Sequence, residues 1–330
     1  MQDSPSAWTP PPAADGVELR DRADEAAWRR AIDAIGARHG LDTSDARLFA
    51  SGSDVVFGTR EVVFKLTDPK WREQVTHERA WLAHVHGRLS VATPRVLGTG
   101  ELEGWPYTLM SRVEGEPLGD VWSRADPATR LALARDVGRL VAEWHALQVP
   151  TRVRDWDAFA PLAIESSQGR LHALAEGRGE LAPLAREALA FLADLARRCG
   201  AASVLDAARA GFGDARRVCL HTELLDQHVL VDASGDAPRP VALIDLADAE
   251  IGPPDYDTPA LVEFVFRGEP GALGAFFEGY DAASGRARGD VRGERCLAWS
   301  LCHRFASLPR LSRAAGDARD LDTLSERLFA

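Results

Sequence analysis

Apolar and polar residues alternate with two different periods in the first third of the chain. Trp28, Ala31, Ile32 and Ile35 recur at helical spacing, which predicts an amphipathic helix. Short runs rich in β-branched and aromatic residues follow, and they are typical of strands. The pattern predicts, in order, a helix over 24–38, strands over 46–50, 54–58 and 61–66, a helix over 73–86, and strands over 95–101 and 107–112.

Helical periodicity dominates from Ala128 onward. Val137, Leu140, Val141 and Trp144 share one stripe, and further helices are predicted over 182–197, 259–280 and 294–307. One β-hairpin interrupts this region. Its strands are the apolar runs Val229–Val231 and Val241–Ile244, and its turn contains Ser234-Gly235-Asp236.

This order predicts an α+β chain of two lobes. Residues 17–112 form a small β-rich N-lobe, and residues 113–330 form a larger, mainly helical C-lobe. The proline-containing segment 1–16 is expected to be a disordered tail. The segment Val113-Glu114-Gly115 links the two lobes.

Charge and composition exclude several classes of function. The net charge of −11 argues against a nucleic-acid partner, because phosphate binding needs a basic face. No apolar run approaches the ~18 residues of a membrane span, so we expect a cytoplasmic protein without a membrane partner, either a monomer or a dimer. The motifs of common hydrolases, zinc proteases, P-loop proteins and Rossmann enzymes do not occur.

Lysine is rare, since only Lys65 and Lys70 occur among 39 basic residues. Lys65 lies in the strand predicted over 61–66, and Glu78 follows thirteen residues later in a predicted helix. A lysine that reaches nucleotide phosphates needs an anion behind it, and a helix packed on the sheet can supply one. The turn Ser51-Gly52-Ser53 lies between the strands predicted over 46–50 and 54–58, one strand before that of Lys65. Its backbone N–H groups could approach phosphates, although a plain hairpin turn has the same composition.

Two acids flank the predicted hairpin in the C-lobe. Glu223 precedes the first strand in the segment H-T-E-L-L-D-Q-H, and Asp245 directly follows the second strand. Phosphoryl transfer uses such a pair, in which one carboxylate orients a hydroxyl group and the other holds the metal on the nucleotide phosphates. We therefore expect the side chains of Glu223 and Asp245 to converge across a shared cleft, opposite the Lys65 ammonium of the smaller lobe.

These segments resemble the aminoglycoside phosphotransferases, small-molecule kinases with a protein-kinase-like fold. The resemblance covers about residues 48–270. The segment F-K-L…P-R-V-L-G-T-G-E-L-E-G-W-P-Y-T-L-M-S-R looks most like the hygromycin-phosphorylating antibiotic kinases. It implies ATP or GTP as the phosphate donor, with Mg²⁺.

The resemblance also implies roles for individual residues. Met110 would line the adenine pocket, and the backbone of Ser111 and Val113 would bond the purine edge. Asp257 would tie the loops together by accepting backbone N–H bonds, and His221 would brace the catalytic loop against it. The other implied site residues are Ser51, Gly52, Ser53, Lys65 and Glu78 at the phosphates, Asp245 and His228 at the metal, and Glu223 at the acceptor hydroxyl.

The catalytic segment departs from the family pattern H-G-D-x4-N at two positions that matter. Glu223 stands in place of the catalytic Asp, and a misplacement of about 1 Å can cost on the order of 100-fold in rate. His228 stands in place of a metal-binding Asn. Imidazole suits softer metals than Mg²⁺, so the second site is weakened, prefers Mn²⁺, or takes an oxygen from Asp226 or Gln227. Alternatively, His228 only packs. Asp248 could either cap the loop or act as a helper ligand of the metal, and both alternatives stay open.

The first functional hypothesis is transfer of the γ-phosphate of ATP to a hydroxyl group of a cationic small molecule, such as the aminoglycoside hygromycin B. The acceptor is expected near the acidic segment with Asp255, Glu263 and Glu269. The alternative is a nucleotide-binding pseudokinase or regulatory module without transfer, which Glu223 and His228 motivate. A third hypothesis is nucleotidyl transfer.

Overall fold

The computed structural model of the chain describes residues 8–12, 19–49, 52–150, 156–235, 237–285 and 292–329. These residues form two compact units. The first contains the described residues up to Gly87, then Ala92–Glu114 and the short segment Asp245–Ala247. The second contains Arg88–Val91, Gly115–Ile244 and the described residues from Asp248 onward. Asp245 thus packs with the first unit, although the segments before and after Asp245–Ala247 belong to the second.

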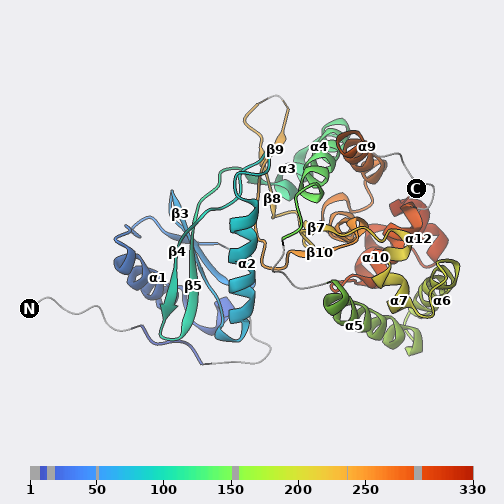
Figure 1. Cartoon of the computed structure of the whole chain (residues 1–330), viewed down its shortest axis with the longest axis horizontal. Coiled ribbons are helices and arrows are strands. Elements are labelled where there is room, and N and C mark those ends of the chain that lie inside the picture. Colours follow the sequence, from blue (N-terminus) through green and yellow to red (C-terminus); the bar gives the residue numbers. More distant parts are fainter. Residues whose placement is uncertain are drawn as a thin grey trace, which may run out of the picture. The chain divides into compact units, whose positions relative to one another are not determined.

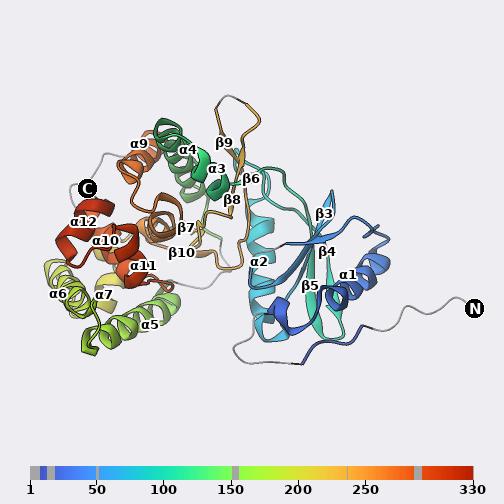
Figure 2. The same ribbon diagram turned by 180° about the vertical axis from the view of Figure 1, so that it is seen from behind.

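The first unit is built on a five-stranded antiparallel sheet in the order β1-β2-β3-β5-β4. Figures 1 and 2 show helices α1 and α2 on opposite sides of these strands. The elements are α1 (Glu25–His39), β1 (Arg47–Leu48), β2 (Val55–Gly58), β3 (Val62–Leu66), α2 (Arg72–Val85), β4 (Val96–Leu102) and β5 (Trp105–Ser111), with short 3₁₀ turns at Leu19–Arg22 and Pro69–Trp71.

Successive side chains of a strand point to opposite faces, so in β3 the apolar core residues lie on one face and the charged residue lies on the other. Phe64 and Leu66 are buried in the apolar cluster that also contains Trp28 and Ile32 of α1. Lys65, between them, points toward α2 on the other face, where its ammonium meets Glu78. The apolar face therefore anchors the strand, and the remaining face is available for a charged group.

Trp8 departs from the disordered tail expected for residues 1–16. Its side chain is buried and lies against Trp28 and Trp105, with ring centroids 6.1 Å and 5.9 Å away. A large aromatic side chain gains enough from burial to hold a short segment against the core. Residues 1–7 and 13–16 of the expected tail lie outside the described residues.

The second unit is mainly helical and contains two small sheets, β10-β7 and β6-β8-β9. The predicted hairpin is confirmed as β8 and β9, whereas Asp236 of its turn lies outside the described residues. The strands are β6 (Glu116–Pro117), β7 (Val218–Leu220), β8 (Val229–Asp232), β9 (Arg239–Leu243) and β10 (Glu250–Gly252). The helices are α3 (Leu118–Arg124), α4 (Pro127–His145), α5 (Trp156–Glu176), α6 (Ala182–Arg198), α7 (Val204–Arg209), α8 (Thr258–Ala260), α9 (Ala272–Ser284), α10 (Arg292–Cys302), α11 (Leu308–Ala314) and α12 (Leu321–Phe329), with 3₁₀ turns at Gly211–Gly213 and Pro254–Asp257.

Two predicted helices are shorter than expected. The helix predicted over 259–280 is interrupted: α8 continues into a π-helical turn, Leu261–Phe266, which ends at Arg267 with φ 47°. Gly268 follows at φ 78°, and α9 begins only at Ala272. The helix predicted over 294–307 ends at Cys302. Apolar periodicity continues across both breaks, because the helix that follows each break buries a face of similar composition. Periodicity alone therefore did not locate the breaks.

Helices α4 and α9 approach each other through glycine. A Cβ atom on Gly138 of α4 would overlap the carbonyl oxygen of Phe276, and one on Gly279 of α9 would overlap the carbonyl oxygen of Arg135. We expect Gly138→Ala to lower the free energy of unfolding by about 3 kcal/mol, because the overlapped atom is backbone and cannot rotate away. Gly274→Ala is the control, since no atom lies within 4 Å of its added methyl group.

That control change is expected to raise stability by about 0.5–1 kcal/mol through helix propensity. Chemical denaturation of the three proteins measures both effects. Equal stability of Gly138→Ala and the unchanged protein would contradict the close approach of α4 and α9.

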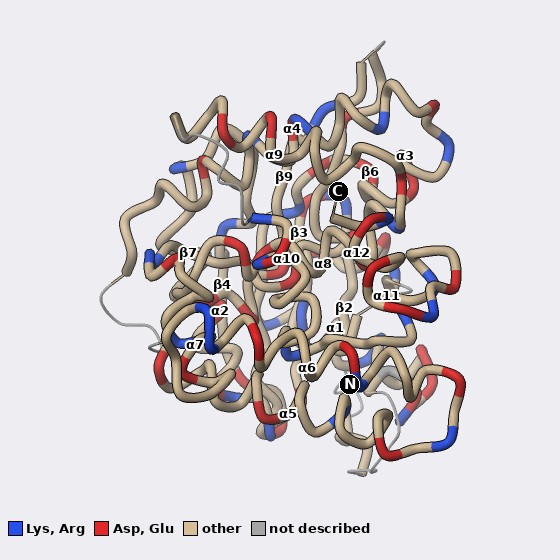
Figure 3. Tube along the Cα trace, turned by 90° about the vertical axis from the view of Figure 1, so that its right-hand side faces the viewer, with Lys and Arg blue, Asp and Glu red and all other residues tan. Residues whose placement is uncertain are grey.

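Acidic and basic residues are interspersed along the trace (Figure 3). On α6, for example, Asp194 pairs with both Arg197 and Arg198. Such exposed pairs contribute little to stability. Among the described residues, no helix combines the length and the apolar character needed to cross a membrane.

Candidate active site

Lys65 lies at the centre of three carboxylates in the first unit. Its Nζ is 3.0 Å from Glu78 Oε1, 3.4 Å from Asp54 Oδ2 and 3.4 Å from Asp245 Oδ1. Strand β3, helix α2, the start of β2 and the segment Asp245–Ala247 each contribute one residue. The sequence indicated three of the four; Asp54 was missed, although it directly follows the Ser51-Gly52-Ser53 turn.

The charges of this cluster do not balance. Lys65 is only 8% exposed, and three carboxylates face its single ammonium group. Burial, helped by the charge of Asp245, raises the pKa of Glu78 to about 7 against the attraction of Lys65. Burial likewise raises the pKa of Asp54. Burial alone would lower the pKa of Lys65, but Asp245, Glu78 and Asp54 together raise it well above its usual value. The cluster therefore holds excess negative charge around a firmly protonated lysine.

Among the described residues, no three His, Cys, Asp or Glu side chains gather into a metal cage. Mg²⁺ does not need one, because it typically takes one or two carboxylates together with substrate phosphates. Asp245 offers such a carboxylate, since its side chain is 36% exposed, whereas Glu78 is buried. The excess negative charge and the oxygen donors of this cluster therefore fit a hard divalent cation.

Asp245 has a left-handed backbone, with φ 62°. Asp and Asn adopt this conformation more readily than most residues, because their short side chains tolerate it. Such strained positions occur often at functional sites.

The predicted nucleotide turn and hinge are only partly described. Ser51 lies outside the described residues; Gly52 has φ 109°, a conformation that suits glycine, and Ser53 is exposed. Met110 is buried at the end of β5. The backbone N–H of Ser111 already donates to the Arg95 carbonyl oxygen at 2.8 Å, so this group is engaged within the sheet unit. Val113 is half-buried beyond the end of β5.

In the second unit, the catalytic loop follows β7 and turns sharply at Thr222. This β-branched residue has φ 64°, which is unusual without glycine. All its polar groups are engaged. Its N–H donates to Asp257 Oδ1 at 2.6 Å, its hydroxyl donates to the Asp248 carbonyl oxygen at 2.8 Å, and its carbonyl oxygen contacts His303 Nε2 at 3.0 Å. Sequence reasoning missed this residue, although the family pattern H-G-D carries glycine at the same place.

Asp257 ties this loop to the rest of the second unit. It accepts the N–H groups of His221 at 3.0 Å and Thr222 at 2.6 Å, which are contacts of the kind that the resemblance implied. His145 Nε2 of α4 also contacts it at 3.0 Å. The His221 imidazole itself contacts the Ile244 carbonyl oxygen instead, at 3.0 Å, so it braces the loop against β9. The loop is therefore fixed on several sides.

Glu223 and Asp248 share one arginine. Arg304 Nη2 lies 2.5 Å from Asp248 Oδ1 and 3.4 Å from Glu223 Oε1. Asp248 thus forms an ion pair, which neither of the two roles considered for it had anticipated. His228 donates from Nδ1 to the Glu223 carbonyl oxygen at 2.7 Å, so any bond from His228 to a metal would come from Nε2.

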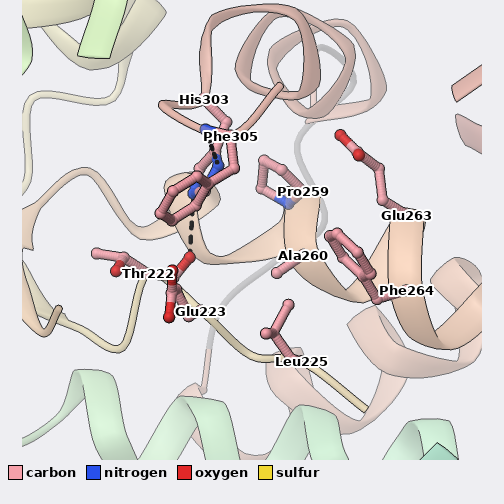
Figure 4. Close-up of a pocket in the computed structure, with 9 residues that line it drawn as sticks. All are labelled: Thr222, Glu223, Leu225, Pro259, Ala260, Glu263, Phe264, His303 and Phe305. Carbon is pink, nitrogen blue, oxygen red and sulfur yellow. Dashed lines mark hydrogen bonds between the residues drawn. The ribbon is translucent and has the colours of Figure 1, made fainter. Parts of the chain in front are cut away.

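A small pocket opens beside Glu223 (Figure 4). Its walls are mostly apolar, with Leu225, Pro259, Phe264 and Phe305 around the Glu223 carboxylate. Glu263 lines the other side, where Arg310 Nε lies 2.8 Å from its carboxylate. Burial raises the pKa of Glu263 to about 7, although Arg310 opposes the rise. The pocket therefore presents a mostly apolar wall beside the Glu223 carboxylate.

The other acids of the predicted acceptor segment are also paired with arginine. Asp255 lies 2.6 Å from Arg295, and Glu269 lies 2.7 Å from Arg130. Neither residue lines the pocket beside Glu223. The negative charge of this segment is therefore largely offset, which weakens the argument for a cationic acceptor from charge alone.

His303 is buried under the catalytic loop in its neutral form. Burial, helped by the charge of Arg304, lowers its pKa to about 3. Its Nε2 donates to the Thr222 carbonyl oxygen, and the Phe305 N–H reaches Nδ1 at 3.3 Å, which requires one protonated and one unprotonated nitrogen. In the unfolded chain this histidine titrates near its ordinary pKa of about 6.5.

A pH-dependent loss of stability follows from this difference. Below pH 6.5 His303 binds a proton in the unfolded state but stays neutral in the native state. This difference is expected to lower the free energy of unfolding by about 2 kcal/mol between pH 7 and pH 5. His303→Gln keeps a hydrogen-bond donor but cannot be protonated. Its free energy of unfolding should therefore fall by about 2 kcal/mol less, between pH 7 and pH 5, than that of the unchanged protein. Urea unfolding at both pH values measures it. The same change at exposed His86 serves as the control, and an equal effect there would contradict the assignment.

Comparison with known proteins places this geometry in a family. Residues 45–292, more than half of the chain, match the model of the phosphotransferase enzyme family. No curated protein sequence matches the chain.

Several solved structures share the fold. An aminoglycoside phosphotransferase solved with GDP and kanamycin is 19% identical, with a TM-score of 0.60, over 90% of this chain and 95% of its own. A macrolide 2'-phosphotransferase from Brachybacterium faecium is 22% identical, with a TM-score of 0.55, over 90% and 96%. An aminoglycoside phosphotransferase from Streptomyces rimosus, solved with ADP and streptomycin, is 18% identical, with a TM-score of 0.57, over 82% and 97%.

These likenesses confirm the predicted α+β, protein-kinase-like fold. The match over residues 45–292 also confirms the resemblance inferred from the sequence motifs. The chain therefore belongs to the phosphotransferase enzyme family, and it is a small-molecule phosphotransferase.

Proposed function

We propose that the protein transfers the γ-phosphate of ATP or GTP to a hydroxyl group of a small molecule, with an aminoglycoside antibiotic as the first candidate acceptor. The observation that carries this proposal is the Lys65 cluster, in which one buried ammonium is held by Glu78 and faces Asp245. The family match supports the reaction class. The GDP and ADP complexes of similar structures support a nucleotide donor.

In this proposal the first unit binds the nucleotide. Glu78 holds the Lys65 side chain extended, so that its ammonium can contact the phosphates. The turn at Ser51-Gly52-Ser53 offers backbone N–H groups to the same phosphates. Met110 and the backbone at Ser111 and Val113 contact the base, where the Ser111 contact has to come from its carbonyl oxygen, because its N–H is engaged.

We assign metal binding to Asp245, with His228 as a second ligand. When bound, a divalent cation such as Mg²⁺ or Mn²⁺ would offset the negative charge of the nucleotide phosphates. The exposed carboxylate of Asp245 and the unbalanced acids around Lys65 support a hard cation there. An imidazole ligand at His228 favours Mn²⁺ over Mg²⁺.

The second unit supplies the acceptor side. Glu223 accepts the proton of the acceptor hydroxyl, or orients that hydroxyl, as its oxygen attacks the γ-phosphorus. The pocket beside Glu223 receives the part of the acceptor that carries the hydroxyl. Because its walls are mostly apolar and both of its acids are paired with arginine, a macrolide belongs in the substrate screen beside the cationic aminoglycosides.

Phosphorus NMR of reaction mixtures tests this function. The purified protein is incubated with ATP or GTP, Mg²⁺ or Mn²⁺, and a panel that includes hygromycin B, kanamycin, streptomycin and a macrolide. A new phosphate-ester signal that appears together with the nucleoside diphosphate supports the proposal. Release of pyrophosphate would show nucleotidyl transfer instead. A thermal shift with nucleotide but no product with any acceptor would favour a regulatory module.

A further inference from the structure

Arg304 occupies an unusual position directly after α10. Its side chain is only 18% exposed and lies over the Phe305 ring, 4.4 Å from the ring centroid. One nitrogen, Nη2, faces both Asp248 at 2.5 Å and Glu223 at 3.4 Å. The short contact fixes the guanidinium on Asp248, and the longer one places positive charge beside Glu223.

The backbone around Arg304 is also fixed. Its N–H donates to the Tyr256 hydroxyl at 3.1 Å, and the preceding His303 contacts the carbonyl oxygen of Thr222 at 3.0 Å. Two consecutive residues therefore hold the catalytic loop, one at the backbone before Glu223 and the other at the Glu223 carboxylate. A rigid support of this kind is what a precisely placed side chain requires.

Glutamate needs more support than aspartate at this place. Its side chain has one more rotatable bond, so more rotamers compete with the productive one. Displacement of a reacting group by about 1 Å can cost on the order of 100-fold in rate. A cation beside the carboxylate reduces this freedom, because it favours the rotamers that keep the Glu223 oxygen near Arg304.

Arg304 also keeps a donor without a partner, since its Nε is buried and makes no hydrogen bond within the described residues. The Nε of Arg292 is buried without a partner in the same way, so both arginines share this feature. Arg304 differs in that its Nη2 faces two acids at once.

We propose that Arg304 is a positioning residue for phosphoryl transfer: anchored on Asp248, it holds the Glu223 carboxylate where the acceptor hydroxyl meets it. This inference rests on the proposed function, in which Glu223 acts on that hydroxyl. Arg304 itself touches neither nucleotide nor acceptor in this proposal.

A double-mutant cycle tests the inference. Steady-state kinetics are measured for the unchanged protein, Arg304→Gln, Glu223→Gln and the double variant, with the acceptor found by the NMR screen. We expect Arg304→Gln to lower kcat by about 10- to 100-fold with little change in the KM for nucleotide. In the Glu223→Gln background the same change should have no further effect, because Arg304 acts through that carboxylate.

A purely structural role predicts a different result. Arg292→Gln is the matched control, since Arg292 forms a buried pair with Asp281 at 2.8 Å and also lies over an aromatic ring, that of Phe277. It should lower thermal stability without a selective fall in kcat. If Arg304→Gln fails to fold, Arg304→Lys keeps the charge beside Asp248 and enters the same cycle, with an expected fall in kcat of about 10-fold.

The outcomes separate this inference from the function itself. The role of Arg304 would be overturned if Arg304→Gln lowered kcat equally in both backgrounds, or in neither. A low kcat of Glu223→Gln would still support the assigned role of Glu223 in that case. Full activity of Glu223→Gln would overturn the assigned role of Glu223, and that of Arg304 with it.

Discussion

Asp245→Asn is expected to lower kcat for phosphoryl transfer by about a thousandfold. The asparagine keeps the shape of the side chain and tolerates the left-handed backbone at φ 62°, but it loses the negative charge that would hold a divalent cation. Loss of several kcal/mol of charge stabilisation corresponds to a fall of this size, at about 1.4 kcal/mol for each factor of ten. Initial rates of nucleoside diphosphate release at saturating substrate measure it.

The stability of Asp245→Asn should change little by comparison. Asp245 is one of three carboxylates around Lys65, and its charge helps to raise the pKa of both Glu78 and Asp54. Its removal relieves that repulsion but also removes an attraction to the buried Lys65 ammonium. Because the two effects oppose each other, the thermal midpoint of Asp245→Asn should stay close to that of the unchanged protein. Asp232→Asn, at the end of β8 in the same hairpin, is the control and should keep full activity. Full activity of Asp245→Asn would refute the metal assignment.

Glu223→Gln is expected to lower kcat by about 10²- to 10⁴-fold, the usual range for loss of a general base. The amide cannot accept the proton of the acceptor hydroxyl, yet it has nearly the same volume as the carboxylate. The KM for nucleotide should change little, because nucleotide binding is assigned to residues of the first unit. Kinetics with varied acceptor and varied nucleotide separate the two effects.

Glu223→Asp restores the residue that the family pattern has, and it is nevertheless expected to lower kcat by about 100-fold. Contacts with Asp257, His303 and Arg304 hold the loop in place, so we expect its backbone not to shift to compensate for a shorter side chain. The shorter aspartate would stop about 1 Å or more short of the position of the Glu223 carboxylate. Glu116→Gln, an exposed residue of the same unit paired with Arg124, serves as the control. Unchanged activity of Glu223→Asp would show that the loop does not depend on side-chain length.

Much of the first unit could be predicted from local pattern. Strand alternation placed Lys65 opposite the apolar core, and the helix after it carried Glu78 on the side that faces the strand. Both signals are short-range, because they depend on period and spacing within about fifteen residues. Asp54 was missed, since an acid at the start of a strand more often faces solvent.

The second unit was less predictable. The hairpin β8–β9 followed from its apolar strands, but the arginine partners of Glu223, Glu263 and Asp255 lie 40 to 81 residues away in sequence. Nothing in a chain with so many arginines indicates which of them pairs with which acid. The break at Arg267-Gly268 was also missed, because the apolar pattern continues across it.

The sequence alone determined the class of fold, the β3 lysine with its helix glutamate, and the two acids that flank the hairpin, because residue type and spacing specify local structure and its exposed chemistry. Only the tertiary structure decided that Lys65 faces three carboxylates, that Thr222 takes a strained backbone, and that Arg304 stands between Asp248 and Glu223. Those features depend on packing between segments far apart in the chain, where burial fixes the partner of each charge.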